Sequence, residues 1–290
     1  MAQQATRSLD GKTALISGAT NGIGFEAAVV LAREGASLVI VGRDAARTAE
    51  SLAEVKRRSG SSSVESLLCD FSSQASIRRL AADFRARHQR LDLLVNNAGT
   101  VNLERRLTAD GIEQTFAVNH LGYFLLTNLL LDLLVASAPA RVVNVASTVH
   151  YQGKLDFDDL GYERGYKIFR AYARSKLGNV LFTRKLARRL EGKGVTVNAL
   201  HPGAVATNIW NSSVPAWTQP ILAVLKKLSM ITPEQGAQAI TYLATSPEVE
   251  GKSGLYFEKN RVKAPSRLAQ DDALADRLWS ESARLVKLPA

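Results

Sequence analysis

Short apolar segments alternate with amphipathic segments along most of the chain. The apolar segments are rich in β-branched residues and the amphipathic ones repeat at helical spacing, which predicts strands alternating with helices. The expected strands are Thr13–Ser17, Ser37–Val41, Ser63–Cys69, Leu91–Asn96, Ala140–Ala146, Val195–Leu200 and Gly254–Phe257. The expected helices are Gly24–Gly35, Ala45–Ser59, Ser73–Gln89, Leu107–Ala136, Tyr172–Lys193, Pro233–Thr245 and Asp271–Leu285. Because most strands are apolar throughout, we expect a doubly wound α/β domain spanning residues 1–290, with seven parallel strands and helices on both faces.

Four segments stand outside this alternation. Residues 1–10 are polar and predict a flexible N-terminal arm, and residues 265–290 predict a helical extension. Thr148–Arg170 is an insertion rich in Gly, Asp and Tyr. Residues 205–231 follow a Pro-Gly turn and are expected to form a lid over the substrate, since loops at strand carboxyl ends carry the sites of α/β enzymes. This lid contains three large apolar side chains, which either face an apolar substrate or only pack within it: Trp210, Trp217 and Leu222.

Composition narrows the class of protein. The chain has 290 residues, of which 46% are hydrophobic and 22% charged, as is typical of a globular domain. Cys69 is its one cysteine, so no intramolecular disulfide can form. The N-terminus has no apolar signal core, and the longest apolar stretch, Leu121–Ala138, is interrupted by Asp132. We therefore expect a cytoplasmic protein without a membrane span.

The net charge of +10 raises the question of an anionic partner. Ten basic residues and one acidic residue fall within residues 164–193, whereas residues 1–140 are nearly neutral. No helix-turn-helix, zinc finger or aromatic RNA-binding motif accompanies this charge, so nucleic acid is not an expected partner. The basic residues at the end of this stretch are expected to form a solvated face or the rim of an interface: Arg184, Lys185, Arg188, Arg189 and Lys193.

A glycine-rich turn follows the first strand and leads into a helix. It runs Ser17-Gly18-Ala19-Thr20-Asn21-Gly22-Ile23-Gly24. Such a turn lets backbone N–H groups and the helix N-terminus approach a pyrophosphate, and its place between strand and helix favours phosphate binding over a plain turn. We expect a Rossmann-type dinucleotide site here. Its expected cofactor-binding residues are Gly18, Thr20, Asn21, Gly22, Ile23 and Gly24.

The end of the second strand predicts which dinucleotide binds. An acidic residue there would hold the ribose 2′-hydroxyl of NAD, but this chain has Gly42 followed by Arg43. A guanidinium can pair with the 2′-phosphate of NADP, which favours NADP over NAD. Asp44, next to Arg43, weakens this argument, and Arg43 could instead be a solvated loop residue.

Tyr172 and Lys176 are four residues apart on an expected helix and therefore share a face. A phenol with a pKa near 10 is poorly matched to proton transfer near neutral pH. A neighbouring ammonium favours the phenolate and should lower that pKa. Ser147 follows an apolar strand and could hydrogen-bond a substrate oxygen, and Asn119 lies between the fourth and fifth strands.

Taken together, these residues resemble the short-chain dehydrogenase/reductase family from Gly11 to Phe257. The matching motifs are Gly18-x3-Gly22-Ile23-Gly24, Asn96-Asn97-Ala98-Gly99, Asn119, Ser147, Tyr172-x3-Lys176 and Pro202-Gly203-x-Val205-x-Thr207. The resemblance implies that Tyr172 is the acid/base and that Ser147 polarises the carbonyl. Lys176 would lower the pKa of Tyr172 and bind the nicotinamide ribose, while Asn119 would position a water that relays protons to Lys176.

The resemblance also implies further cofactor contacts. Asp70 and Phe71 match positions that hold adenine, Asn97 would line the adenosine-side ribose, and Thr207 would touch the carboxamide. The remaining matched residues expected at the cofactor are Ala98, Gly99, Pro202, Gly203 and Val205. The 24 residues between Ser147 and Tyr172 fit the retinol dehydrogenase-like and WW-domain-oxidoreductase-like branch, whose members commonly prefer NADP(H). Retinoid specificity does not carry over from this resemblance.

The expected function is an NADP(H)-dependent oxidoreductase that acts on an apolar carbonyl or alcohol of small-molecule size. The alternatives are a non-catalytic NADP(H)-binding redox sensor and a double-bond reductase similar to protochlorophyllide reductase. Metal is not expected, because the histidines and Cys69 lack ligand spacing. The resemblance implies a homodimer or homotetramer formed through the helices at Leu121–Ala136 and Tyr172–Lys193.

Overall fold

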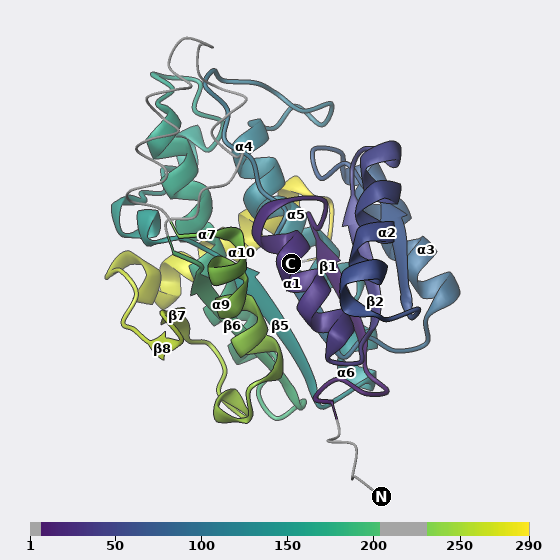
Figure 1. The fold of residues 1–290 in the computed structure, drawn as a ribbon. Coiled ribbons are helices and arrows are strands. Elements are labelled where there is room, and N and C mark those ends of the chain that lie inside the picture. The colour runs from purple at the N-terminus through teal and green to yellow at the C-terminus, as the bar shows by residue number, and fades with distance from the viewer. Residues whose placement is uncertain (1–6, 204–230, 290) are drawn as a thin grey trace, which may run out of the picture.

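The computed structural model describes residues 7–203 and 231–289. This part of the chain forms one sheet in the order β3-β2-β1-β4-β5-β6-β7-β8 (Figure 1). The seven expected strands all form, and each neighbouring pair among them is parallel. They are β1 (Thr13–Ser17), β2 (Ser37–Gly42), β3 (Val64–Leu68), β4 (Leu93–Asn96), β5 (Ala140–Val145), β6 (Val195–His201) and β7 (Tyr256–Glu258). The doubly wound fold is confirmed.

An eighth strand was not expected. It is β8 (Arg261–Val262), which pairs antiparallel with β7 at the edge of the sheet. The two residues joining β7 to β8, Lys259 and Asn260, both have positive φ, as a two-residue hairpin turn requires. The sequence prediction missed this hairpin because no glycine marks the turn and the strand is only two residues long.

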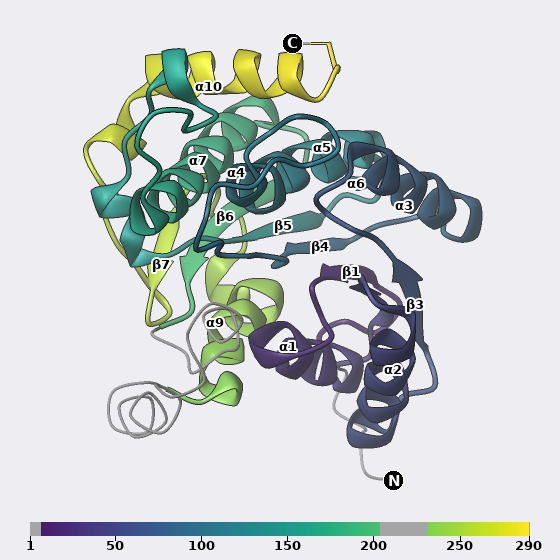
Figure 2. The same cartoon turned by 90° about the horizontal axis from the view of Figure 1, so that it is seen from above.

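Helices cover both faces of the sheet (Figure 2). On one face lie α1 (Gly22–Arg33), α2 (Ala45–Ser59) and α9 (Pro233–Thr245). On the other lie α3 (Gln74–Arg87), α4 (Gln114–Phe116), α5 (Gly122–Leu129), α6 (Leu131–Ala136), α7 (Ile168–Arg189) and α10 (Asp272–Leu285). Each face buries its own apolar cluster against the sheet, which explains why the strands are apolar throughout.

The expected helix Leu107–Ala136 is wrong before Gln114 and is broken thereafter. Leu107 forms a bridge with Glu113, and helix starts only at Gln114, because Gly111 turns the chain back with φ +74°. A single π-helical turn, Ala117–Leu121, then separates α4 from α5. The insertion after β5 contains two short 3-10 turns, η2 (Thr148–Gln152) and η3 (Phe157–Asp159).

Helix α10 forms an additional layer outside α7 (Figure 2). The Trp279 ring stacks on Phe182 of α7 and meets the edge of Phe124 of α5. The buried imidazole of His120 lies against the same cluster, with its Nε2 2.9 Å from the Ser282 hydroxyl of α10. The C-terminal extension therefore covers part of the α5 and α7 surface.

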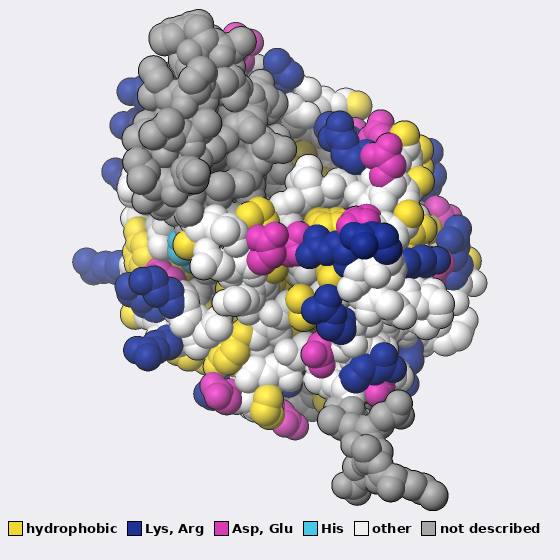
Figure 3. All heavy atoms as spheres, viewed as in Figure 1, with side chains coloured by type: hydrophobic (Ala, Val, Ile, Leu, Met, Phe, Trp, Pro, Cys, Tyr) yellow, Lys and Arg dark blue, Asp and Glu magenta, His cyan; other side chains and the backbone are white. Residues whose placement is uncertain are grey.

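The basic residues at the end of α7, for which the sequence predicts a solvated face or the rim of an interface, are partly exposed, and three of them meet acidic side chains of α10. Asp272 and Asp276 of α10 pair with Arg184, Lys185 and Arg188. The guanidinium of Arg189 lies over the Trp279 ring at 4.5 Å from its centroid. The two carboxylates of α10 therefore compensate part of this charge within the chain. On the opposite face, basic side chains are spread out among acidic ones (Figure 3).

Candidate functional site

A cleft of about 830 Å³ lies at the carboxyl ends of the parallel strands. We call it the carboxyl-end cleft. Most of the residues expected from the sequence line it: Gly18, Thr20, Asn21, Gly22, Ile23, Gly24, Arg43, Asp70, Phe71, Asn97, Ala98, Gly99, Ser147, Tyr172, Lys176, Pro202 and Gly203. Residues as far apart in sequence as Gly18 and Gly203 thus meet at one edge of the sheet, where doubly wound folds place their ligands.

The glycine turn is shaped by close backbone approaches. A Cβ on Gly18 would lie 2.7 Å from the Ala98 Cα, and Gly18 also has φ +67°. A Cβ on Gly24 would lie 2.4 Å from the Gly18 carbonyl oxygen. The Asn97 amide donates to the carbonyls of Ser17 and Gly18 at 2.9 and 3.0 Å, while the Ser17 hydroxyl accepts the Asn97 and Ala98 N–H groups. Asn97 thus fixes the turn against the end of β4, which leaves a narrow cradle of the shape that a pyrophosphate needs.

Space at Gly42 is filled by its neighbours. A Cβ there would lie 2.1 Å from the Thr48 Oγ1 and 2.5 Å from the Thr20 Cγ2. An acidic side chain at this position therefore has no room. Asp44 is the N-cap of α2, where its carboxylate accepts the Arg47 N–H at 2.9 Å. The Asp44 carboxylate is thus engaged in capping α2, while Arg43 and Arg47 line the cleft.

On the far side of this end of the cleft, Asp70 and Phe71 follow β3. The Asp70 carboxylate accepts hydrogen bonds from the backbone and hydroxyl of Ser72 at 2.9 and 2.8 Å. The Phe71 ring packs against Gly122 of α5, where a Cβ would lie 2.8 Å from its edge. Cys69 is buried beside them, and burial raises the pKa of its thiol to about 12, so it remains a thiol.

Ser147, Tyr172 and Lys176 meet at the other end of the cleft. Tyr172 and Lys176 lie on α7, and Ser147 is the N-cap of the turn η2 that follows β5. A hydrogen bond joins Ser147 and Tyr172. The Lys176 ammonium lies 5.6 Å from the centroid of the Tyr172 ring and donates to the Val145 carbonyl at 2.9 Å.

The expected lowering of the Tyr172 pKa is wrong for this structure. Burial raises the pKa of Tyr172 to about 12, and the hydrogen bond with Ser147 opposes only part of that rise. Burial also lowers the pKa of Lys176 to about 7, because the residue is only 3% exposed and no carboxylate faces its ammonium in the described structure. Near neutral pH, Tyr172 is therefore a neutral phenol suited to donating a proton.

Asn119 is buried in the π-helical turn and does not line the cleft. Its amide oxygen accepts the Thr100 N–H at 2.7 Å, and its amide nitrogen donates to the Thr100 carbonyl and the Ser175 hydroxyl. It therefore reaches the site through Thr100, which lines the cleft, and Ser175, next to Lys176. The extra residue of a π-turn is often found at functional sites.

Several lining residues were missed by sequence reasoning: Val41, Arg47, Cys69, Ser72, Thr100, Gln114, Val118, Val145, Ala146, Thr148, Val149 and His201. A signal existed for two of them. Arg47 lies four residues after Arg43, and His201 directly precedes Pro202-Gly203. Burial lowers the pKa of His201 to about 4, so its imidazole is neutral. Val205, Thr207 and the expected lid at 205–231 fall largely outside the described residues, as do Trp210, Trp217 and Leu222.

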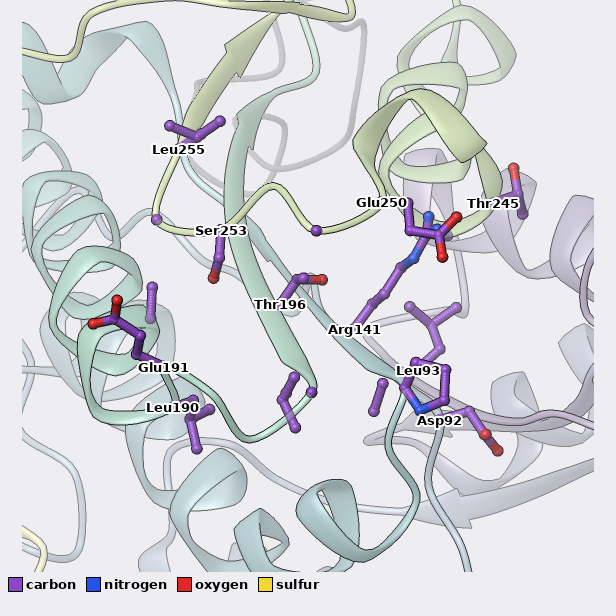
Figure 4. A pocket seen from close by; sticks show the side chains of 18 of the residues that line it. Asp92, Leu93, Arg141, Leu190, Glu191, Thr196, Thr245, Glu250, Ser253 and Leu255 are labelled. Carbon is purple, nitrogen blue, oxygen red and sulfur yellow. The ribbon is translucent and has the colours of Figure 1, made fainter.

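A second cleft, of about 850 Å³, lies at the amino ends of the strands (Figure 4). Two of its charged groups already have partners. Arg141 donates to the carbonyls of Leu243 and Ser246, and Asp92 accepts the Thr13 N–H and pairs with Lys12. These contacts fasten α9 and the strand ends together, so this cleft has a structural explanation.

The part of the chain that the structure describes contains no group of three or more His, Cys, Asp or Glu side chains arranged to hold a metal ion. None of the helices formed by residues 7–203 and 231–289 is both long and apolar enough to cross a membrane.

A glycine cradle, an arginine beside it and a Ser-Tyr-Lys set in one cleft of a doubly wound sheet define a dinucleotide-binding oxidoreductase. The chain belongs to the short chain dehydrogenase family, whose model matches residues 12–217. It is an oxidoreductase that uses NAD(P) and acts on alcohol or carbonyl groups. This confirms the expected family and reaction class.

Known proteins resemble the chain over nearly its whole length. Retinol dehydrogenase 13 of Homo sapiens is 43% identical over 286 residues, covering 97% of this chain and 86% of the relative. Retinol dehydrogenase 14 of Homo sapiens is 43% identical over 294 residues, covering 97% and 88%. Among solved structures, the RhlG/NADP active-site complex of Pseudomonas aeruginosa is 28% identical with a TM-score of 0.70, covering 88% of this chain and 98% of that one.

Proposed function

We propose that the chain transfers hydride between NADP(H) and an apolar carbonyl or alcohol, with Tyr172 as the proton donor and acceptor. The observation that carries this proposal is the convergence of Ser147, Tyr172 and Lys176 at the end of the carboxyl-end cleft. NADPH, when bound, supplies the hydride, and the protein orients the reacting groups. The residues that would hold the dinucleotide are the cradle at Gly18–Gly24 and the residues lining the cleft up to Lys176.

The roles of the three side chains follow from their protonation. In reduction, the neutral phenol of Tyr172 donates its proton to the carbonyl oxygen as negative charge develops there. The Ser147 hydroxyl, already hydrogen-bonded to Tyr172, stabilises the same oxygen. Lys176 holds the ribose and replaces the proton on Tyr172, since its pKa of about 7 lets it give up a proton readily. In oxidation, each proton moves in the opposite direction.

The preference for NADP rests on the end of β2. Thr48 and Thr20 exclude an acidic side chain at Gly42, and Asp44 is occupied as a helix cap. Arg43 and Arg47 are then the charged groups available to a 2′-phosphate at this end of the cleft. The RhlG structure, in which NADP occupies the active site, agrees with this preference.

Replacing Arg43 tests the cofactor preference. Arg43→Ala should weaken NADPH binding about 10- to 100-fold and leave NADH binding nearly unchanged, because only NADPH carries the 2′-phosphate. Binding of both cofactors is measured by fluorescence titration. Arg57→Ala, on the exposed side of α2 where Arg57 pairs with Glu54, is the matched control and should change neither affinity. An equal loss for NADPH and NADH in Arg43→Ala would show that Arg43 does not recognise the 2′-phosphate.

An apolar substrate is supported by the lining near Ser147, where Val118, Val145 and Val149 face the cleft. The names of the retinol dehydrogenase relatives point the same way. The test is a panel of short and long aliphatic aldehydes, aromatic aldehydes, ketones and alcohols including retinol, followed by NADPH absorbance. We expect turnover that improves with the apolar length of the substrate. No turnover across the panel, with NADPH binding intact, would contradict the proposed function.

A further inference from the structure

His150 is a completely buried histidine that none of the proposed catalytic steps uses. It lies in η2, three residues after Ser147, and both of its ring nitrogens are engaged. Nδ1 lies 2.7 Å from the Ser147 carbonyl oxygen, and Nε2 lies 3.1 Å from the backbone nitrogen of Ser266. A carbonyl only accepts and a backbone N–H only donates, so Nδ1 must carry the proton and Nε2 must accept. The contacts therefore assign one neutral tautomer.

The two hydrogen bonds of the His150 ring form a bridge between Ser147 and Ser266. At the Ser147 end of this bridge, the backbone and side chain are held in one conformation. The Ser147 carbonyl also accepts the His150 backbone N–H at 3.1 Å, and the Ser147 hydroxyl oxygen accepts the Val149 N–H at 3.3 Å. Because the hydroxyl oxygen accepts a hydrogen bond from η2, its own proton is left for a partner outside the turn, and Ser147 shares a hydrogen bond with Tyr172. The direction of the hydroxyl therefore depends on the orientation of the turn.

The turn itself is pressed onto α7. A Cβ on Gly153, which ends η2, would lie 2.7 Å from both the Ala173 carbonyl and the Leu177 Cβ. No side chain fits between η2 and the helix that carries Tyr172 and Lys176. A change in the turn would therefore alter the geometry between Ser147 and Tyr172.

The other end of the bridge is the segment after β8. The Tyr256 ring meets the His150 ring edge-on at 4.6 Å between centroids, and the Tyr151 ring lies 4.1 Å away. The Tyr151 hydroxyl donates to the Ala264 carbonyl at 2.8 Å, two residues before Ser266. These contacts anchor His150 on the C-terminal part of the chain, which lies outside the strands and helices that build the cleft.

We propose that His150 is a positioning residue that sets the direction of the Ser147 hydroxyl by donating from Nδ1 to the Ser147 carbonyl. This inference rests on the proposed function, because it assumes that Ser147 acts on the substrate oxygen. The bond to Ser266 holds the imidazole in the required tautomer, and the bond to Ser147 transmits its position to the site.

Two amide substitutions separate the two ends of the bridge. In His150→Asn the amide nitrogen can take the place of Nδ1 and keep the bond to Ser147, whereas in His150→Gln the amide oxygen can take the place of Nε2 and keep the bond to Ser266. Each variant loses one buried hydrogen bond, so a merely structural role predicts similar effects on both. The positioning role predicts that His150→Gln loses kcat about 10- to 100-fold, while His150→Asn stays within about threefold of the wild type.

The variants are compared by kcat and KM for the best aldehyde of the panel, by NADPH affinity and by melting temperature. We expect NADPH affinity to be unchanged in both, since His150 does not line the cleft. An equal loss of kcat in the two variants, a larger loss in His150→Asn, or no loss in either would overturn the inference. Ser147→Ala keeps this outcome separate from the proposed function. If Ser147→Ala retains the wild-type kcat, the proposed role of Ser147 fails. If Ser147→Ala is slow but His150→Gln and His150→Asn do not differ as predicted, only the role of His150 fails.

Discussion

At the scale of single residues, the site depends on glycines at positions where a Cβ atom would clash with neighbouring atoms. A Cβ on Gly18 would clash with the Ala98 Cα. A Cβ on Gly42 would clash with the side chains of Thr48 and Thr20. The glycines of the turn could be predicted from the sequence, since their spacing signals a phosphate cradle. The close approach of Thr20 and Thr48 to Gly42 could not be predicted from the sequence, because these residues meet only in the folded chain.

Two glycines allow the cradle to be tested separately from backbone strain. Gly18 and Gly60 have nearly the same positive φ, +67° and +73°, but a Cβ on Gly60 would meet nothing within 4 Å. Alanine should therefore cost about 1–2 kcal/mol of unfolding free energy at either position through the backbone alone. Gly18→Ala should in addition weaken NADPH binding at least about tenfold, because Ala98 and the turn must move apart. Urea unfolding and fluorescence titration measure the two effects, and equal NADPH affinities in the two variants would refute the cradle.

The ionisation of Lys176 gives a pH-dependent stability. Its pKa is about 7 in the folded protein and near 10.5 when unfolded, so between these values the unfolded chain binds more protons. The free energy of unfolding should therefore rise with pH above 7, by about 1 kcal/mol per pH unit from this residue. Lys176→Met removes the group. Urea unfolding at pH 7, 8 and 9 without added cofactor should show the wild type gaining stability relative to Lys176→Met, and parallel profiles would contradict the lowered pKa.

At the scale of elements, most helices and strands could be predicted within a few residues because their apolar periodicity is strong. The misplaced ends have local causes. Helix α7 begins at Ile168, four residues before the expected start, because Lys167 is an N-cap without a side-chain hydrogen bond and leaves no sequence signal. The π-turn around Asn119 could not be predicted, since one extra residue in a helix hardly alters an apolar pattern.

Helix α10 shows how a predicted element can have an unpredicted effect. Its apolar face was readable from the sequence, but its docking onto α7 was not, and the ion pairs with Arg184, Lys185 and Arg188 depend on that docking. The surface expected to join subunits is partly occupied by the chain's own C-terminal helix (Figure 2). Any association through α5 and α7 must therefore include α10 or displace it.

Packing rather than charge should hold α10 in place. Trp279 is 5% exposed between Phe124 and Phe182, so Trp279→Ala should lower the free energy of unfolding by about 3–5 kcal/mol. Asp272 and Asp276 are more than half exposed, so replacing both with Asn should cost less than about 2 kcal/mol. Chemical unfolding of the two variants makes the comparison. The reverse ranking would mean that the ion pairs, and not the aromatic cluster, fasten this helix.

At the scale of the whole molecule, the sequence motifs are separated by long stretches of chain that the sheet brings to one edge. Parallel strands place their carboxyl ends together, so residues following β1, β2, β4, β5 and β6 had to converge once the topology was right. Protonation states could not be predicted in this way. The pKa values of Tyr172 and Lys176 depend on burial by surrounding elements, and burial reversed the expected shift of the tyrosine.

In the proposed mechanism, the neutral phenol of Tyr172 donates the proton during reduction of a carbonyl. Tyr172→Phe keeps the ring and removes only the hydroxyl, so the cleft should retain its shape. We expect NADPH to bind with an affinity within about threefold of the wild type, while kcat for the best aldehyde falls by about 10²- to 10⁴-fold. Paired measurement of NADPH affinity and turnover in this one variant decides the matter, and near-wild-type turnover would contradict the proposed mechanism.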